Sequence, residues 1–275
     1  MHIAIASGKG GTGKTTVAIS LALVAKPPVR LVDCDVEGPN CHLFLKPEVT
    51  VSRTVHVTVP EIDLARCDFC GKCRDICAFK AISVFGKNIM TFPELCHSCK
   101  GCFLICPNKA VGEGRREIGI ITEGSVQGIE IKTGTLKIGE AMSPPLIKRL
   151  RERAADNVLT IIDAPPGTSC PVIAATRGAD YTLLVTEPTP FGLNDLKLAA
   201  GLMEKLDQRF GIVINKAGIG DNRVEKWCRK TGHPLLLSIP FDRRLAEAYS
   251  TGVPVIKAAP ELRPMFERLL EEMTT

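Results

Sequence analysis

Short apolar runs alternate with segments of helical periodicity along most of this chain. Apolar runs with the length of buried strands lie at residues 2–6, 29–32, 158–162, 181–186, 211–214 and 235–239. Apolar residues at helical spacing lie between or after them, near 14–24, 143–154, 192–208, 221–230 and 261–273. A strand, a helix and a second strand in this order form a βαβ unit, and such units build a parallel sheet. Because the strands are apolar throughout, we expect helices on both faces, which is a doubly wound α/β fold.

A cysteine-rich segment interrupts this alternation at about residues 60–110 and contains an internal repeat. A repeat with its own composition indicates a separate small domain. Glycine-rich alternating residues at about 111–139 predict antiparallel strands or a hairpin that lead back to the first domain. We therefore expect a discontinuous α/β domain of residues 1–59 and 111–275, interrupted by an inserted domain of residues 60–110.

Composition is that of an ordinary soluble globular protein, with 45% apolar and 24% charged residues. The first predicted strand begins at residue 2, so we expect no signal peptide, and no apolar run approaches the roughly 18 residues of a membrane span. Twelve cysteines in such a chain favour metal binding in a reducing compartment over disulfides. We therefore expect a cytoplasmic protein.

A glycine-rich loop follows the first strand and opens the first helix. Residues 8–15 read Gly-Lys-Gly-Gly-Thr-Gly-Lys-Thr and fit the phosphate-loop (P-loop) pattern G-x-x-x-x-G-K-[ST]. The glycines let backbone N–H groups turn onto phosphate oxygens, and the helix N-terminus adds its positive dipole end. We expect Lys14 to pair with the β- and γ-phosphates and Thr15 to offer its hydroxyl to Mg²⁺. The residues predicted to bind ATP or ADP in this loop are Gly8, Lys9, Gly10, Gly11, Thr12, Gly13, Lys14, Thr15 and Thr16.

The second residue of this loop, Lys9, resembles the signature lysine of the deviant Walker A motif in MinD/ParA-type ATPases and in the nitrogenase iron protein. In that group the lysine reaches the nucleotide of the other subunit in an ATP-bound dimer. The resemblance implies a nucleotide-dependent homodimer with slow, dimer-dependent ATP hydrolysis. Within one chain, Lys9 could instead be a solvent-exposed loop charge.

Two further segments resemble the switch regions of the same group. Val32-Asp33-Cys34-Asp35 resembles switch I, which implies that Asp33 stands near Mg²⁺ and that Asp35 orients the attacking water. The segment from Ile161 to Gly167 resembles Walker B and switch II, which implies that Asp163 holds the water shell of the metal and that Gly167 donates an N–H near the γ-phosphate. The predicted catalytic residues are Lys9, Lys14, Asp35 and Asp163, and the predicted Mg²⁺ ligands are Thr15, Asp33 and Asp163.

The base-binding part of the site is also implied by this resemblance. Asn215-Lys216, at the end of a predicted strand, resembles the adenine-reading asparagine and its neighbour. Pro240-Phe241, after a later strand, would flank the base. Because Asp residues often end strands simply as turn formers, a single such segment is weak evidence. The resemblance therefore rests on the order and spacing of all these segments together.

The repeat in the inserted segment is one cysteine spacing used twice. The two runs are Cys67-x2-Cys70-x2-Cys73-x3-Cys77 and Cys96-x2-Cys99-x2-Cys102-x3-Cys106-Pro107. This is the bacterial ferredoxin spacing, in which the fourth cysteine of each run ligates the other cluster. The predicted ligand sets for two [4Fe–4S] clusters are Cys67, Cys70, Cys73 with Cys106, and Cys96, Cys99, Cys102 with Cys77. Zinc is the competing metal, but structural zinc takes two C-x2-4-C pairs separated by a longer loop.

Taken together, the chain resembles MinD-superfamily P-loop ATPases that contain an inserted α+β bacterial ferredoxin-like domain. Two clusters with their thiolates would each carry roughly −2 and would nearly cancel the formal charge of +5, so we expect no nucleic-acid partner. The resemblance implies a P-loop ATPase with Mg²⁺ and ATP or ADP that couples nucleotide state to electron transfer. Its partner would be an unidentified redox protein or apo-metalloprotein.

Two alternative functions remain open at this point. One is an iron–sulfur or metallocofactor assembly and carrier ATPase. The other is a MinD/ParA-like positioning switch with redox sensing, which would require a membrane helix or a clear basic patch. Transfer of a cluster to an apo-acceptor would discriminate the carrier from the electron-transfer protein.

Cys170 follows the predicted switch II and stands where the nitrogenase iron protein carries a cysteine that ligates a shared cluster. That arrangement needs a second cysteine per subunit, which the sequence does not identify, so we expect Cys170 to hold no cluster. Replacement by serine (Cys170→Ser) should leave the iron content of the anaerobically purified protein at the two-cluster level. A drop in iron on this substitution would favour the shared cluster.

Overall fold

The computed structural model describes residues 1–152 and 158–274, and the chain divides into two compact units. The large unit contains Met1–Arg53, Ile121–Thr135 and Ser143–Thr275, and the small unit contains Thr54–Ile120 and Leu136–Met142. The small unit extends beyond the predicted insert of residues 60–110, because the two long strands β3 and β6 each contribute residues to both units.

The large unit is built on a sheet with the strand order β11-β10-β9-β1-β8-β2-β7-β6-β3. Pairing is parallel from β11 through β7. The strands are β1 (His2–Ala6), β2 (Val29–Asp33), β3 (Glu48–Ile62), β6 (Val111–Val126), β7 (Ile129–Leu136), β8 (Leu159–Asp163), β9 (Tyr181–Thr186), β10 (Phe210–Ala217) and β11 (Leu235–Pro240). The predicted parallel α/β sheet is thus confirmed.

A two-residue turn joins β6 to β7. Gln127 and Gly128 both have positive φ (51° and 79°), as in the turns that connect antiparallel neighbours. Since β7 is parallel to β2, β6 runs against the rest of the sheet, in agreement with the antiparallel strands predicted at about 111–139.

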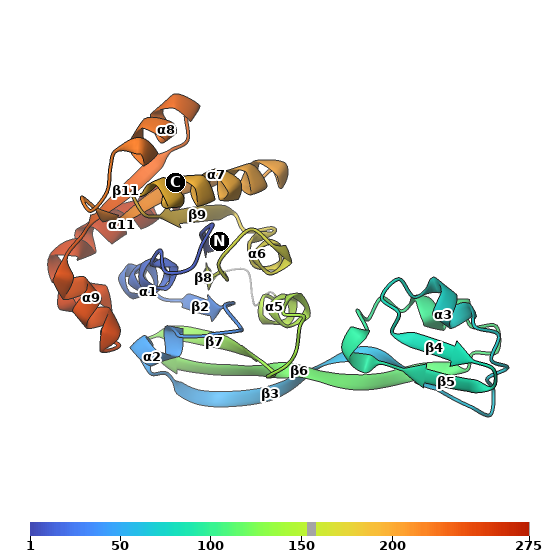
Figure 1. Ribbon diagram of the computed structural model, residues 1–275. Coiled ribbons are helices and arrows are strands. Elements are labelled where there is room, and N and C mark those ends of the chain that lie inside the picture. The colour runs from blue at the N-terminus through green and yellow to red at the C-terminus, as the bar shows by residue number, and fades with distance from the viewer. Residues whose placement is uncertain (153–157, 275) are drawn as a thin grey trace. The chain divides into compact units, whose positions relative to one another are not determined.

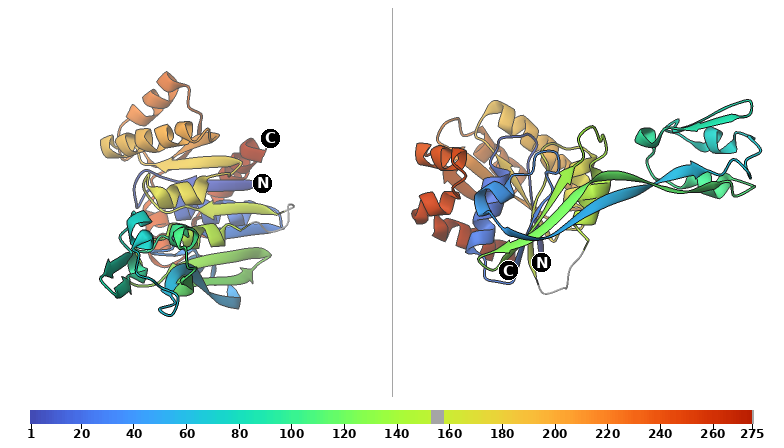
Figure 2. Two further views of the ribbon diagram at one scale, coloured as in Figure 1. Left: turned by 90° about the vertical axis from the view of Figure 1, so that its right-hand side faces the viewer. Right: turned by 90° about the horizontal axis from the view of Figure 1, so that it is seen from below.

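Helices cover both faces of this sheet, and Figure 1 shows α1 and α11 on one face and α5 and α6 on the other. Figure 2 shows the same layers in two further views, each turned by 90° from that of Figure 1. The helices are α1 (Lys14–Val24), α2 (Cys41–Leu45), α5 (Pro144–Leu150), α6 (Cys170–Thr176), α7 (Pro190–Lys205), α8 (Arg223–Thr231), α9 (Arg243–Ser250), α10 (Val255–Ala258) and α11 (Arg263–Thr274), with a 3-10 turn at Pro260–Leu262. The predicted helix at 143–154 ends at Leu150, and residues 153–154 lie outside the described residues.

The core lies between α1, α11 and the central strands. Ile3, Ile5 and Leu31 of the strands and Leu21 of α1 have no exposed surface, and Phe266 of α11 is 1% exposed. Apolar strands of this kind have no solvent-facing side, which is why their sequence shows continuous apolar runs instead of alternation. The central strands are therefore fixed in register, and the loops at their carboxyl ends are held at one edge of the sheet.

The small unit has a thin core. Its hairpin pairs β4 (Ile82–Phe85) with β5 (Asn88–Thr91), and its helices are α3 (Lys72–Ile76) and α4 (Gly101–Ile105), which pack together, with a 3-10 turn at Pro93–Leu95. Its buried apolar clusters each contain only three residues, and cysteines belong to both. A core of this size supplies little stability by itself, and units of this size commonly need a metal or disulfides.

Among the described helices, none is both long and apolar enough to span a bilayer.

Leu21 provides a test of the core. Replacing it with alanine (Leu21→Ala) removes a side chain with 0% exposure from α1 without lowering helix propensity, so we expect the free energy of unfolding to fall by about 3 kcal/mol. The matched control is Leu198→Ala on α7, where the leucine is 59% exposed and the expected change is within about 0.5 kcal/mol. Urea unfolding followed by circular dichroism measures both, and equal losses would contradict this description of the core.

Candidate functional site

The glycine-rich loop occupies the carboxyl end of β1, where the parallel sheet presents several loops at one edge. Residues 7–13 turn directly into α1, whose first residue is Lys14. Gly11 and Gly13 have φ of 78° and 95°, a left-handed conformation that side chains disfavour. The glycines of the motif are therefore required by the backbone path that brings the loop to the N-terminus of α1.

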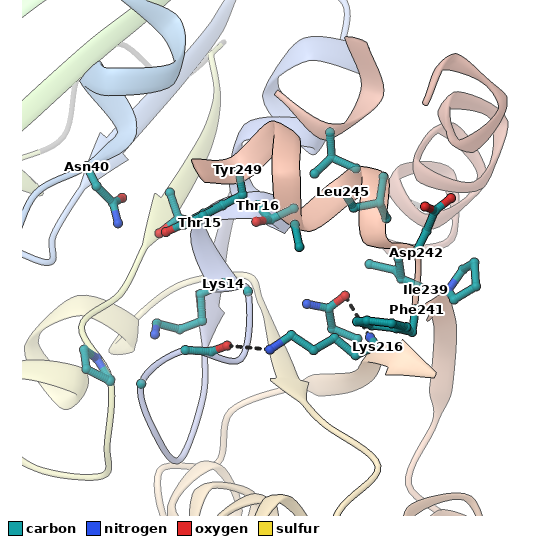
Figure 3. A pocket seen from close by; sticks show the side chains of 18 of the residues that line it. Lys14, Thr15, Thr16, Asn40, Lys216, Ile239, Phe241, Asp242, Leu245 and Tyr249 are labelled. Atoms are coloured by element: carbon teal, nitrogen blue, oxygen red, sulfur yellow. Dashed lines mark hydrogen bonds between the residues drawn. The ribbon is translucent and has the colours of Figure 1, made fainter. Parts of the chain in front are cut away.

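A cavity of about 340 Å³ lies beside this loop within the large unit (Figure 3). Of the predicted residues, those that line it are Gly10, Gly11, Gly13, Lys14, Thr15, Thr16, Asp35, Asn215, Lys216, Pro240 and Phe241. The remaining lining residues were not predicted: Asn40, Pro166, Ile239, Asp242, Leu245, Ala246, Tyr249, Val255 and Phe266. The structure therefore brings segments from six parts of the sequence around one cavity.

Two buried aspartates lie behind the cavity wall. Asp33 ends β2 and Asp163 ends β8, and the two are partners in the register of these parallel strands. The Thr15 hydroxyl donates to Asp163 Oδ2 at 2.5 Å. Asp33 accepts backbone N–H groups from Asp35 (3.2 Å), Asn40 (2.9 Å) and Cys41 (3.0 Å). Neither aspartate has exposed surface. Both lie behind Thr15 and Asn40, which line the cavity and are hydrogen-bonded to them.

Burial sets the proton affinity of this site. It raises the pKa of Asp163 to about 7 and of Asp35 to about 6, the neighbouring aspartates adding to it and the Lys14 ammonium opposing it. Burial also raises the pKa of Asp33, against the lowering effect of its backbone hydrogen bonds. Burial lowers the pKa of Lys14, although the nearby Asp163 and Asp35 raise it in part. A group of this kind has a deficit of positive charge that a cation would fill.

Lys9 does not line the cavity. Its Nζ lies 2.9 Å from Glu187 Oε2, and Lys216 Nζ lies 2.5 Å from Glu187 Oε1. Burial raises the pKa of Glu187, but the two lysines outweigh it and hold the net pKa below its usual value. Glu187 was not predicted, since a single acid after a strand resembles many turn residues. The structure places Lys9 in an ion pair within its own chain, which differs from the free loop charge considered above.

Asn215 and Lys216 approach the loop from the end of β10. The Asn215 side-chain amide donates to Thr12 O at 2.8 Å, and Lys216 Nζ donates to Gly11 O at 3.4 Å. Across the cavity, α9 contributes Leu245 and Tyr249 (Figure 3). These two were missed because α9 spans only Arg243–Ser250 and its apolar pattern was not assigned to an element.

Several predicted residues lie near the cavity without lining it. Gly167 donates its N–H to Ser7 O at 3.0 Å, so in this conformation that amide is not directed at a phosphate. Gly8 packs closely on the backbone of Asp195 in α7, where a Cβ has no room. The other predicted residues outside the lining are Lys9, Thr12, Asp33 and Asp163.

The small unit has two further small cavities, each lined by four cysteines. Cys67, Cys70, Cys73 and Cys106 line one, of about 20 Å³. Cys77, Cys96, Cys99 and Cys102 line the other, of about 30 Å³. These groupings have the same members as the two predicted ligand sets; ligation of clusters by them stays a prediction.

The cysteine sulfurs of both groups accept backbone hydrogen bonds. Ala81 N donates to Cys77 Sγ (3.3 Å), Ser98 N to Cys96 Sγ (3.4 Å) and Ala110 N to Cys106 Sγ (3.2 Å). Cys70 and Cys99 are exposed, whereas Cys73 and Cys96 are buried. Each group thus has one exposed cysteine and one buried cysteine.

The fold and the loop together define a P-loop nucleotide-binding protein. A glycine-rich loop joins the central strand to a helix N-terminus, a lysine and a threonine of that helix line one cavity, and two strand-end aspartates lie behind its wall. The chain belongs to the CobQ/CobB/MinD/ParA nucleotide binding domain family, whose model matches residues 3–255. It is a P-loop ATPase of the MinD/ParA type.

Relatives align over almost the whole chain. Uncharacterized protein MJ0578 of Methanocaldococcus jannaschii is 33% identical, over 98% of this chain and 97% of its own. Uncharacterized protein MJ0579 of the same organism is 30% identical, over 94% and 92%. A protein of Pyrococcus horikoshii named iron-sulfur cluster carrier protein is 26% identical, over 98% of this chain and 86% of its own.

Solved structures show the same fold. The septum site-determining protein MinD of Pyrococcus horikoshii, complexed with Mg-ADP, has a TM-score of 0.58 at 22% identity and covers 98% of this chain and 94% of its own. The cell division ATPase MinD of Pyrococcus furiosus has a TM-score of 0.59 at 24% identity, with 100% and 98% covered.

The raised pKa of Asp163 predicts an unusual pH dependence of stability. An aspartate whose folded pKa is raised stabilises the fold fully below its unfolded pKa of 3.8 and loses that contribution as the pH rises through about 7. We expect the nucleotide-free protein to lose about 1–2 kcal/mol of unfolding free energy between about pH 5 and about pH 7.5, and Asp163→Asn to reduce that loss. Asp207→Asn, at an exposed position, is the control. Parallel urea-unfolding profiles for all three proteins would contradict the prediction.

Proposed function

We propose that this chain is an iron–sulfur cluster carrier ATPase, which holds two [4Fe–4S] clusters on the small unit and uses ATP binding to control their delivery to apo-metalloproteins. The observation that carries the proposal is the pair of four-cysteine cavities in a chain that also has the P-loop site. Relatives that align over most of this chain and are named iron-sulfur cluster carrier proteins support it.

The residues of the P-loop site have distinct roles in this proposal. Lys14 and the loop amides hold the β- and γ-phosphates, and Thr15, Asp33 and Asp163 place Mg²⁺ and its water shell. Asp35, which lines the cavity, orients the attacking water. Asn215, Lys216, Pro240 and Phe241 form the base pocket. The orphaned buried oxygens Thr12 Oγ1, Asn40 Oδ1 and Asp163 Oδ1 support a bound polar ligand or cation, because buried polar atoms normally have partners.

The spacing of the cysteine sulfurs favours a cluster over a single zinc ion. Tetrahedral zinc with Zn–S bonds of about 2.3 Å holds its sulfurs about 3.8 Å apart. Within the part of the chain that the structure describes, no three of the eight sulfurs lie within 4.8 Å of one another. A wider set of four thiols around a small hollow fits a cubane, which places iron and sulfide between the ligands. The thin core of the small unit fits a bound group that adds stability.

Exposure of one ligand in each set favours a carrier. A cluster leaves its carrier when thiolates of the acceptor replace its ligands, so at least one ligand position must be open to an incoming thiol. Cys70 and Cys99 are exposed and meet this requirement. The clusters are therefore treated as cargo that the small unit holds and releases.

A nucleotide-dependent homodimer is the second part of the proposal. The Lys9 ammonium is held by Glu187 in this conformation, and the MinD/ParA resemblance implies that it contacts the nucleotide of the other copy. Dimer formation would then require Lys9 to leave Glu187. The exchange is between two anionic partners, a carboxylate and a phosphate, so the lysine keeps a counter-charge in both states.

Electron transfer is the second candidate function. Its support is that both sets contain four cysteines and receive backbone N–H bonds at sulfur, the environment that also holds permanent clusters in ferredoxins. In that case ATP would change the reduction potential or the partner contacts of the clusters, and the clusters would stay on the chain.

Anaerobic purification followed by a transfer assay tests the proposal. We expect about eight iron atoms per chain, since each of two clusters holds four, and transfer of clusters to an apo-ferredoxin at a rate that ATP changes. Lys14→Ala should keep its iron and lose the ATP effect, because the lysine lies in the large unit and the cysteines in the small unit.

The matched control for the cysteines is Cys228→Ser, a buried cysteine on α8 outside both sets, which should behave as the wild type. Retention of all iron in the presence of the apo-acceptor, with an ATP-dependent reduction rate, would favour electron transfer. A colourless, zinc-loaded protein from anaerobic cells would contradict both functions.

A further inference from the structure

One group of potential metal ligands in the large unit contains a thiol. Single ligand atoms of Asp33, Cys41 and Asp163 all lie within 4.8 Å of one another, and none of the three residues has exposed surface. Cys41 Sγ lies 3.6 Å from Asp163 Oδ2, and Cys41 N donates to Asp33 Oδ2 at 3.0 Å. Cys41 is the first residue of α2, so the helix start fixes the thiol between the two carboxylates.

The group lies directly behind the wall of the nucleotide cavity. Thr15 lines the cavity and donates its hydroxyl to Asp163, and Asn40 lines the cavity and donates its N–H to Asp33. A cation that enters the cavity therefore reaches the group after one of these two residues moves. The cavity itself supplies the entry path that a buried metal site needs.

One oxygen atom of this group lacks a hydrogen-bond partner within the part of the chain that the structure describes. Asp163 Oδ1 is buried and has no hydrogen-bond partner among the described residues. Its other oxygen is in contact with Thr15 and Cys41. A fully buried carboxylate oxygen without a donor is costly unless a cation or donor occupies the space beside it. This orphaned oxygen belongs to a residue of the predicted Mg²⁺ site, and as a structural observation it points to a bound cation.

The thiol decides which cations this group prefers. Mg²⁺ binds oxygen ligands almost exclusively and keeps several waters. Thiolate sulfur with carboxylate oxygen is a mixed set that suits Zn²⁺ or Fe²⁺, and the later first-row ions bind such sets more tightly than Mg²⁺ does. The Cys41 thiol is therefore a soft ligand that lies beside the position of Mg²⁺ in the proposed function.

We propose that Asp33, Cys41 and Asp163 form a site for a thiophilic divalent cation, of which Zn²⁺ is the probe, and that this cation excludes Mg²⁺·ATP from hydrolysis. Binding replaces the proton on the Cys41 sulfur with a metal–sulfur bond, and the proton leaves to water. The cation also takes Asp163, and with it the partner of the Thr15 hydroxyl, away from Mg²⁺. The inhibition rests on the proposed ATPase site, whereas the binding of Zn²⁺ does not.

Zinc binding is measured on the anaerobic, cluster-loaded full chain, so that the eight cysteines of the small unit are occupied. Equilibrium dialysis without nucleotide should find one tight Zn²⁺ per chain, and zinc-edge X-ray absorption should find one sulfur among oxygen neighbours. Cys41→Ser should weaken Zn²⁺ binding by about tenfold or more, since it replaces a thiolate with a hydroxyl. Cys228→Ser, also a buried cysteine, should bind Zn²⁺ as the wild type does.

Zinc inhibition of ATP hydrolysis is the second measurement. At fixed Mg²⁺·ATP, the concentration of Zn²⁺ that halves the rate should rise about tenfold or more in Cys41→Ser and stay unchanged in Cys228→Ser. Equal sensitivity of all three proteins would overturn the proposal. So would zinc with four sulfur neighbours, which would place it in a cluster site, or zinc with none.

Two controls separate the possible failures. Thermal unfolding and iron content show whether Cys41→Ser folds, and the absorption measurement on the wild type decides the site without any variant. If the wild type binds one zinc through one sulfur but hydrolyses no ATP, the cation site stands and the proposed function fails.

Discussion

Two carboxylates lie side by side at the carboxyl edge of a parallel sheet, and the arrangement around them organises the large unit. Asp33 and Asp163 are register partners on β2 and β8, and neither has exposed surface. Buried anions of this kind require nearby donors or cations. The backbone supplies N–H groups to Asp33, and the P-loop supplies the Thr15 hydroxyl to Asp163. The loop, the segment after β2 and the end of β8 are therefore held together by the same electrostatic requirement.

Lysines satisfy a second part of this requirement. Lys14 is buried near Asp163 and Asp35, so the site contains more acidic than basic groups, which favours the binding of a cation. Lys9 and Lys216 are instead paired with Glu187. Lys216 lines the cavity, whereas Lys9 does not. In the proposed cycle Lys9 exchanges this carboxylate for a phosphate. In the proposed dimer, this ion pair within the chain would have to break before Lys9 reaches the nucleotide of the other copy.

The small unit follows a different principle. Its apolar clusters are too small to supply much stability, and its cysteines gather around two hollows. A metal group would add free energy of folding where apolar burial does not. Cys70 and Cys99 are exposed residues, which in the proposed function leaves one ligand position of each set open to an incoming thiol. In the proposed function, the same cysteines would therefore both stabilise the small unit and release the cluster.

The sequence by itself determined the parallel sheet and the P-loop, and its two predicted cysteine sets have the same members as the linings of the two small cavities. The apolar strands are recognisable because both faces of the sheet are covered. The loop is recognisable because its tight turn favours glycine, as at Gly11 and Gly13, where φ is positive. Short helices such as α2 and α9 carry too few residues for a periodic pattern. Only the tertiary structure therefore shows that Leu245 and Tyr249 line the cavity and that Cys41 lies beside Asp163. Tertiary structure alone decided the pairing of Lys9 with Glu187, which lies far from it in sequence, and the unpartnered oxygen of Asp163. Local residue pattern fixes which elements form, whereas contacts between distant loops depend on how the sheet brings the strand ends together.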